Sequence, residues 1–168
     1  MTNPERAEVQ MRQASRAMTQ RQIESAMRRR MRRWKLFNPR GPLFAIRLEN
    51  GDWSLGYASR RGVHPKDTHW DANIIKGVFY LLRIQVAPMY RGRGDGAKLY
   101  ELIEQLACDL GCTQIRQHPS GWTPTGETRK SYLERRGWID DGIESFKLLA
   151  ANDPTAVQLI DGAKGRGI

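Results

Sequence analysis

The sequence predicts a single α/β domain, in which a mixed central β-sheet is flanked by helices on both faces. Strand-like and helical patterns alternate along residues 43–150, the order expected of an α/β chain. The chain has 168 residues, a length typical of one domain with a full hydrophobic core. We divide it into a basic helical segment over 1–40, a sheet-forming core over 41–152 and a C-terminal tail over 153–168.

Residues 4–36 predict two consecutive helices. Pro4 suits a first turn, and residues 5–36 contain neither glycine nor proline. Thr19 and Gln22 have the spacing of a capping box, so a break is expected near Thr19. Apolar residues recur at helical spacing in two stripes that we expect to face the core: Ala7, Met11, Ala14 and Met18, then Ile23, Met27, Met31 and Trp34.

Most of the excess positive charge lies in this segment. Residues 1–40 hold 11 Lys and Arg against 3 acids, whereas residues 41–168 hold 17 against 15. The densest group, called here the Arg28–Lys35 cluster, comprises Arg28, Arg29, Arg30, Arg32, Arg33 and Lys35. Two interpretations remain open: a solvated helix face, or a surface that binds nucleic acid or an acidic protein.

The next part of the chain predicts a hairpin, a loop and a long strand. Asn50-Gly51 between the strand-like runs 43–48 and 53–59 indicates a β-hairpin. Residues 60–71 are polar, and we expect a loop over one edge of the sheet. The strand 77–86 should have one apolar face and one that turns polar, so its second half is expected to open to a pocket. The two faces are expected to be Val78, Tyr80, Leu82, Ile84 and Val86, and Phe79, Leu81, Arg83 and Gln85.

Two helices and three short strands are expected after this strand. Leu99, Ile103, Leu106 and Leu110 recur at helical spacing, and Gly111 supplies a stop. Residues 113–118 suit a strand, 125–136 a helix that ends at Gly137, and 138–141 and 145–150 the final strands.

Three glycines at alternate positions, Gly92, Gly94 and Gly96, join the long strand to the first of these helices. Such a concentration implies positive φ or a close approach of another group to the backbone. The N-terminus of the helix has free N–H groups, and its dipole favours anions. Arg91 and Arg93 add positive charge at the same place. A pyrophosphate is therefore the expected ligand, although the spacing fits neither a dinucleotide fold nor a P-loop.

Two motifs carry a family resemblance. Residues 86–96, Val-Ala-Pro-Met-Tyr-Arg-Gly-Arg-Gly-Asp-Gly, resemble the coenzyme A signature of the GNAT superfamily of N-acetyltransferases, whose loop reads Gln/Arg-x-x-Gly-x-Gly/Ala. Residues 132–138, Tyr-Leu-Glu-Arg-Arg-Gly-Trp, resemble the next motif of that family, about forty residues later. The resemblance covers roughly residues 43–150 and implies an acyl-CoA N-acyltransferase-like fold.

The resemblance also implies a donor site for acetyl-CoA. The strand 77–86 would splay away from the strand 113–118, with the pantetheine arm in the wedge. The backbone amide near Val86 would meet the thioester carbonyl. The pyrophosphate would be held by the loop residues Arg91, Gly92, Arg93, Gly94, Asp95 and Gly96.

Asp95 departs from the family, which usually has a small or apolar residue there. Its carboxylate is an anion beside the expected pyrophosphate, or it caps the following helix instead.

Candidate catalytic residues follow less directly. By the resemblance, a tyrosine four residues before the glycine of the second motif protonates the departing thiolate, but that place is Leu133, and Tyr132 is one residue early. We therefore expect either Tyr132 or another group to supply this proton. His118 is the candidate general base because its side chain titrates in the useful range, the alternative being a surface or turn histidine.

The expected function is acetyl transfer from acetyl-CoA, a co-substrate, to a primary amine of an unidentified small molecule or protein. The alternative is a GNAT-like fold with weak or no catalysis that acts as a nucleic-acid- or protein-binding module through its basic segment.

Other expectations concern metals, tryptophans and location. Cys108 and Cys112 lack partners at ligand spacing, so we expect buried or half-buried thiols and no metal. Trp138 should lie in the core, and Trp70 and Trp122 in loops that could border the acceptor site. No run approaches the roughly 20 apolar residues of a membrane span, and no apolar signal core is present, so we expect no membrane contact and a cytoplasmic location.

Overall fold

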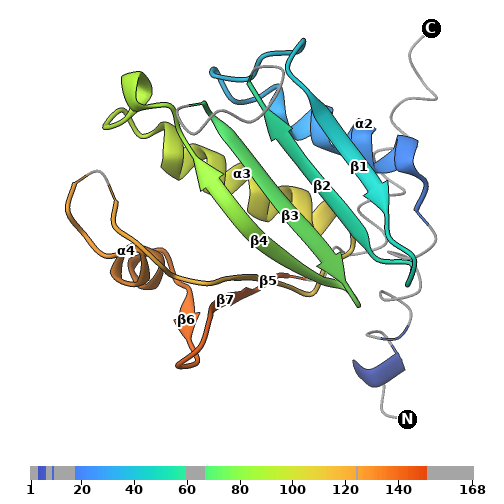
Figure 1. Ribbon diagram of the computed structural model, residues 1–168. Coiled ribbons are helices and arrows are strands. Elements are labelled where there is room, and N and C mark those ends of the chain that lie inside the picture. Colours follow the sequence, from blue (N-terminus) through green and yellow to red (C-terminus); the bar gives the residue numbers. More distant parts are fainter. Residues whose placement is uncertain (1–3, 7–8, 10–17, 60–66, 124, 151–168) are drawn as a thin grey trace, which may run out of the picture.

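A computed structural model gives the fold, and it describes residues 4–6, 9, 18–59, 67–123 and 125–150. Elements carry the labels of Figure 1. The labelled helices are α2 (Gln20–Met31), α3 (Asp95–Asp109) and α4 (Arg129–Arg135), with the short 3-10 helix η1 (Pro88–Tyr90). The strands are β1 (Leu43–Arg47), β2 (Trp53–Ala58), β3 (His69–Ile75), β4 (Val78–Gln85), β5 (Gln114–Gln117), β6 (Ile139–Asp140) and β7 (Ser145–Leu148).

The strands of the described residues form one mixed sheet, as the sequence predicts. Their order is β1-β2-β3-β4-β5-β7-β6. Neighbours are antiparallel except β4 and β5, which run parallel because α3 crosses over between them. The β1/β2 hairpin is confirmed, with Leu43 opposite Tyr57 and Arg47 opposite Trp53.

Helix α2 begins where the capping box predicts. The Gln22 N–H donates to Thr19 Oγ1 (3.2 Å), and the Thr19 N–H donates to Gln22 Oε1 (2.8 Å). The apolar stripe from Ile23 to Trp34 is confirmed, because all four of its residues are buried in the core cluster. Of the first stripe, Met18 packs against the core, and the other residues lie outside the described part of the chain: Ala7, Met11 and Ala14.

Helices α2 and α3 lie side by side on the same face of strands β1 to β4 (Figure 1). These two helices form one helical layer against the sheet. Arg30 Nη2 of α2 donates to Asp109 Oδ1 of α3 at 2.8 Å, which ties the two together. The predicted core stripe of α3 is confirmed as buried: Leu99, Ile103, Leu106 and Leu110.

Strand β3 corrects the prediction of a loop over residues 60–71. Residues 60–66 lie outside the described part, but the strand already begins at His69. Trp70 is buried in the core rather than at an acceptor site, so that expectation is wrong. Asp71 and Asn73 alternate with buried residues, and this polar outer face gave the stretch its loop-like composition.

Strand β4 contains a β-bulge. The consecutive residues Asp71 and Ala72 of β3 pair with Arg83 and Leu81, so Leu82 has no partner on β3. An extra residue in one strand shifts the alternation of the side chains beyond it.

The bulge exchanges the two faces of β4. Before it, Phe79 is buried in the core, while after it Ile84 and Val86 pack against that core. The predicted single face from Val78 to Val86 is therefore wrong, since no regular alternation continues through the strand. The expectation that its second half opens to a pocket is confirmed, because Ile84, Gln85 and Val86 line a cavity.

Strands β4 and β5 pair over only part of their length. The pairing runs from Val78 opposite Gln114 to Tyr80 opposite Arg116, and β4 then continues to Gln85. Figure 1 shows the two strands diverging beyond that point. The chain passes from the open end of β4 through η1 and the glycine loop into α3, which places the loop at the mouth of the wedge.

The last elements match the predicted order. Helix α4 starts at Arg129 rather than near residue 125, because Thr128 is its cap: Thr128 Oγ1 accepts from the Ser131 N–H at 3.2 Å. Gly137 ends the helix region with a φ of 86°. Strands β6 and β7 follow as expected, and Trp138 is buried in the core.

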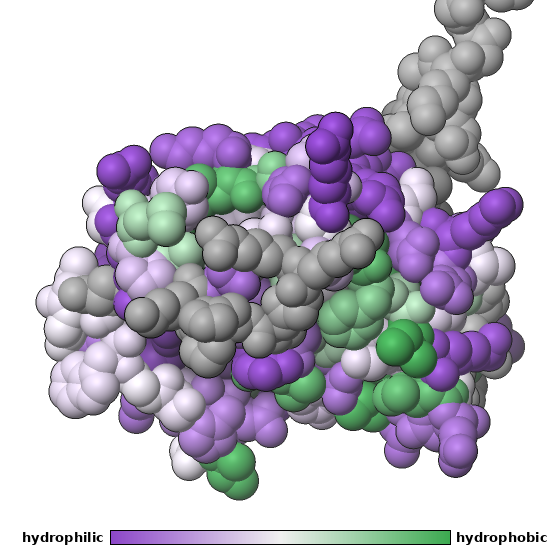
Figure 2. All heavy atoms as spheres, turned by 45° about the horizontal axis from the view of Figure 1, so that its top comes forward, coloured by the Kyte–Doolittle hydropathy of each residue, from purple (hydrophilic) through white to green (hydrophobic). Residues whose placement is uncertain are grey.

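The visible surface in Figure 2 is mainly hydrophilic, with hydrophobic side chains gathered in separate areas. The described exposed hydrophobic residues include Phe44 and Ile46 of β1 and Leu82 at the bulge. Among the described residues, no helix has the length and apolar character that a membrane crossing requires.

Candidate donor site in the β4/β5 wedge

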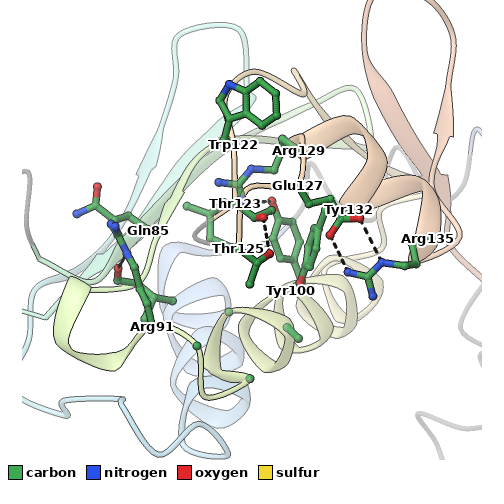
Figure 3. A pocket seen from close by; sticks show the side chains of 16 residues that line it. Gln85, Arg91, Tyr100, Trp122, Thr123, Thr125, Glu127, Arg129, Tyr132 and Arg135 are labelled. Carbon is green, nitrogen blue, oxygen red and sulfur yellow. Dashed lines mark hydrogen bonds and ion pairs between the residues drawn. The ribbon is translucent and has the colours of Figure 1, made fainter.

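A cavity of about 550 Å³ occupies the wedge at the open end of β4 and β5. One wall is formed by the end of β4, the glycine loop and the start of α3. The opposite wall is formed by α4 and by residues that precede it, among them Trp122, Thr123, Thr125 and Glu127 (Figure 3). The predicted site residues on its wall are Val86, Arg91, Gly92, Gly94, Gly96 and Tyr132.

The glycine loop presents bare backbone to this cavity. Gly92 and Gly94 have φ values of 78° and 80°, which other residues rarely adopt. A Cβ on either glycine would have nothing within 4 Å. Gly94 is the N-cap of α3, and no side chain of the described residues caps that helix. The first N–H groups of α3 therefore remain available to an anion.

Arg91 and Arg93 differ in where their side chains lie relative to the cavity. The Arg91 Nε donates to the Val86 carbonyl oxygen at 3.0 Å, which anchors the side chain on the cavity wall. Arg93 is exposed and does not line the cavity.

Asp95 does not line the cavity either, and it does not cap α3 with its side chain, so the capping expectation is wrong. Its side chain instead contacts the turn that follows α2, where Lys35 Nζ lies 3.4 Å from Asp95 Oδ1.

The one-residue offset of the second motif puts Tyr132, and not Leu133, on the cavity wall. Leu133 is fully buried in the core, whereas Tyr132 lines the cavity. The two neighbours point in different directions because one residue turns a helix by about 100°. Arg135 and Arg136 lie with their guanidinium carbons 5.5 and 5.7 Å from the centre of the Tyr132 ring.

Tyr100 of α3 is a cavity residue that the sequence analysis did not find. Its hydroxyl donates to Gln117 Oε1 (2.7 Å) and accepts from Arg129 Nη1 (3.4 Å). Its ring centre lies 5.7 Å from that of Tyr132 (Figure 3). Burial raises the pKa of Tyr100 above its ordinary value, so the hydroxyl stays protonated and forms a fixed part of the wall. Its helical spacing with Leu99 and Ile103 made it look like another core residue.

A carboxylate also reaches the cavity wall. Glu127 pairs with Arg135, which donates to it through Nε (3.2 Å) and Nη2 (2.9 Å). The hydrogen bonds from Arg135 hold the pKa of Glu127 below its ordinary value, so the side chain is ionised near neutral pH. Trp122, which is 69% exposed, also lines the cavity next to this pair.

His118 is not part of this arrangement. It is exposed and does not line the cavity, where it would have to lie to act on a bound amine. Cys112 is buried and Cys108 partly buried, both as free thiols, which confirms the expectation of buried thiols. Among the described residues, no group of three or more His, Cys, Asp or Glu side chains could hold a metal ion.

The chain belongs to the acetyltransferase (GNAT) family, whose sequence profile matches residues 9–121. Among curated proteins, it is 30% identical to thialysine N-epsilon-acetyltransferase of Sus scrofa over 79 residues, which are 47% of this chain and 37% of that protein. It is 31% identical to the Mus musculus protein of the same name over 71 residues, 39% of this chain and 42% of that protein. The chain thus spans well under half the length of these relatives.

Among solved structures, the chain resembles the PaiA N-acetyltransferase of Thermoplasma acidophilum in complex with coenzyme A. The TM-score is 0.39 and the sequence identity 19%, over 56% of this chain and 58% of that one. The family assignment rests on the sequence profile and not on this similarity.

Proposed function

We propose that this chain is an N-acetyltransferase that moves an acetyl group from acetyl-CoA to a primary amine. The glycine loop on the cavity wall carries the proposal, because Gly92 and Gly94 expose backbone to open space at the N-terminus of α3. A pyrophosphate could approach that backbone closely and accept its N–H groups. Membership in the acetyltransferase (GNAT) family supports the same donor.

The donor would lie along the wedge. The N–H groups at the start of α3, with Arg91, would bind the pyrophosphate, and the space between Val86 and α4 would hold the pantetheine arm. Acetyl-CoA supplies the thioester whose acetyl group is transferred. The side chains of Tyr100 and Tyr132 form the floor on the α4 side and would exclude water from the reacting end.

Transfer of the acetyl group requires charge-stabilising and proton-transfer steps. A backbone N–H near Val86 would stabilise the oxyanion that develops as the amine nitrogen bonds to the thioester carbonyl carbon. Tyr132 would donate a proton to the thiolate as the C–S bond breaks and sulfur keeps the electron pair. The amine arrives as a cation, so its nitrogen loses one proton to water before it can attack. It loses a second proton as the amide forms, and this proton would restore the Tyr132 hydroxyl through water. Glu127, which is ionised and paired with Arg135, is the carboxylate on the described wall that could attract the cation.

The acceptor that we propose is a primary amine at the end of a flexible chain. The curated relatives support this choice, since they are named for acetylation of the epsilon amine of thialysine. An amine of this type would be a cation in solution at neutral pH. A carboxylate on the cavity wall, such as Glu127, is the group that would draw it in.

An acetyl-CoA consumption assay with a panel of amines tests this proposal. The full chain would be incubated with thialysine, lysine, polyamines, aminoglycosides and peptides with free N-termini, and the released thiol and acetylated product would be measured. Reactions without amine give the background hydrolysis. Acetylation of at least one amine supports the proposal. No product with any amine, together with no binding of CoA, would contradict it.

We also propose that part of the Arg28–Lys35 cluster binds nucleic acid or an acidic protein. Arg28, Arg29, Arg32 and Arg33 are exposed, and their side chains make no hydrogen bond or ion pair within the described part of the chain. Arg30 and Lys35, by contrast, are paired with acids of α3. The unpaired arginines form the part of the cluster that is free to meet a polyanion.

A further inference from the structure

The turn that follows α2 contacts the start of α3 directly beside the glycine loop. The Trp34 Nε1–H donates to the backbone oxygen of Asp95 at 3.1 Å, in a buried contact between residues 61 positions apart. The next residue, Lys35, places its Nζ 3.4 Å from Asp95 Oδ1. Lys35 is 66% exposed, so it reaches this carboxylate from the surface.

Asp95 occupies a position at which the helix dipole favours an acidic side chain. It is the first residue of α3, where free N–H groups and the helix dipole attract an anion. In this structure the carboxylate makes no such contact. The side chain is 94% buried, and Oδ2 has no hydrogen-bond partner among the described residues.

The carboxylate is turned away from the cavity. The neighbours of Asp95 on both sides, Gly94 and Gly96, line the cavity, but Asp95 itself does not. Its ion pair with Lys35 is the one charged contact that the described residues provide on the other side. A buried carboxylate without a partner is costly, so loss of Lys35 would drive Asp95 toward the nearest free donors. Those donors are the N–H groups of the first turn of α3.

We propose that Lys35 is a positioning residue that holds the Asp95 carboxylate away from the N-terminus of α3, and so keeps those N–H groups free for the phosphates of the donor. The inference rests on the proposed use of acetyl-CoA. Asp95 and the pyrophosphate compete for the same N–H groups, and the Lys35 ammonium decides the competition. The lysine thus acts on donor affinity although it does not line the cavity.

The test is a double-mutant cycle on CoA affinity, measured by isothermal titration calorimetry with the full chain. Lys35→Met should weaken CoA binding by about tenfold or more, the effect of losing one hydrogen bond from a helix N–H to a charged phosphate. Asp95→Asn should bind CoA at least as well as the wild type. The double variant should return to within about threefold of the wild type, since no carboxylate remains to compete.

Two further variants separate positioning from general charge and from folding. Arg33→Met removes the same charge from the neighbouring surface and should change CoA affinity less than about twofold. Lys35→Arg keeps the ion pair and should bind CoA like the wild type. Circular dichroism spectra check that each variant is folded, which the exposure of Lys35 favours.

The outcomes separate this inference from the function on which it rests. If the wild type binds CoA and Lys35→Met weakens binding no more than Arg33→Met does, the inference is wrong and the donor assignment stands. The same holds if the double variant is as weak as Lys35→Met. If the wild type does not bind CoA at all, the donor assignment and the inference both fail.

Discussion

Replacing Gly94 by valine tests the donor site most directly. Gly94 has a φ of 80° and is the N-cap of α3, and a Cβ at this position would project into the open space of the cavity wall. A β-branched side chain in the left-handed region costs roughly 1–2 kcal/mol or forces the loop to move. Either the valine side chain or the displaced loop would block a pyrophosphate from the backbone, so Gly94→Val should lose CoA binding.

The expected signal is a change in the melting temperature. CoA at a hundred times its dissociation constant adds about 2.7 kcal/mol to the free energy of unfolding. In a chain of this size, 1 kcal/mol shifts the melting temperature by about 2–4 °C. The wild type should therefore gain about 5–11 °C with CoA, and Gly94→Val less than about 1 °C, as measured by differential scanning fluorimetry over a CoA titration.

Gly142 provides the matched control. It lies between β6 and β7 with a φ of 92°, a Cβ on it would also meet nothing within 4 Å, and it does not line the cavity. Gly142→Val should thus suffer a comparable backbone strain and a comparable loss of stability without ligand, but keep the full CoA shift. A Gly94→Val protein that keeps the full shift would refute the assignment of the loop. Equal loss of the shift in both variants would show that strain alone explains the effect.

Three further predictions follow from the described contacts. Tyr132→Phe should lower turnover of an accepted amine by about a hundredfold or more with little change in CoA affinity, because the ring on the cavity wall is kept and only the proton-donating hydroxyl is lost; unchanged turnover would remove Tyr132 from the mechanism. Neutralising the exposed arginines from Arg28 to Arg33, with Arg30 and Lys35 kept, should leave CoA affinity within about twofold but weaken binding to single- or double-stranded nucleic acid or an acidic protein. Binding of these partners by the wild type should fall steeply as salt rises from 50 to 200 mM. If the wild type binds none of them even at low salt, the cluster is a solvated face. Burial raises the pKa of the Cys112 thiol above its ordinary 9.0, so the folded state disfavours the thiolate. The free energy of unfolding should therefore fall as pH rises above about 9, and Cys112→Ala should reduce this pH dependence. If a thiol reagent labels Cys112 in the native protein as fast as in the unfolded protein, the burial of Cys112 is contradicted.

The features that could be predicted from sequence are those set by neighbouring residues. The capping box at Thr19, the Asn-Gly hairpin and the helical stripe of α3 each depend on contacts within a few positions, and each is present in the structure. The glycine loop belongs to this group too, because its spacing between a strand and a helix places bare backbone at a helix N-terminus whatever the rest of the chain does.

Features that depend on residues far apart in the chain could not be predicted from the sequence. The bulge at Leu82 arises from the pairing of β4 with β3, and it exchanges faces that a regular alternation keeps constant. Strand β3 was hidden because its outer face is polar, and only its position inside the sheet shows that Trp70 is core. Which of Tyr132 and Leu133 faces the cavity likewise depended on how α4 packs against the sheet.

The sequence by itself therefore determined the family to which the chain belongs and the order of the elements other than β3, because local periodicity and the glycine motif depend only on residues that are close together in the chain. The tertiary structure decided which side chains share the cavity: Tyr100 and Glu127 arrive there from separate elements, while His118 and Asp95 do not. It also decided that Lys35 meets Asp95 across 60 residues. Such contacts form only when the sheet and helices pack together, since no short-range pattern in the chain encodes a distance between residues so far apart in sequence.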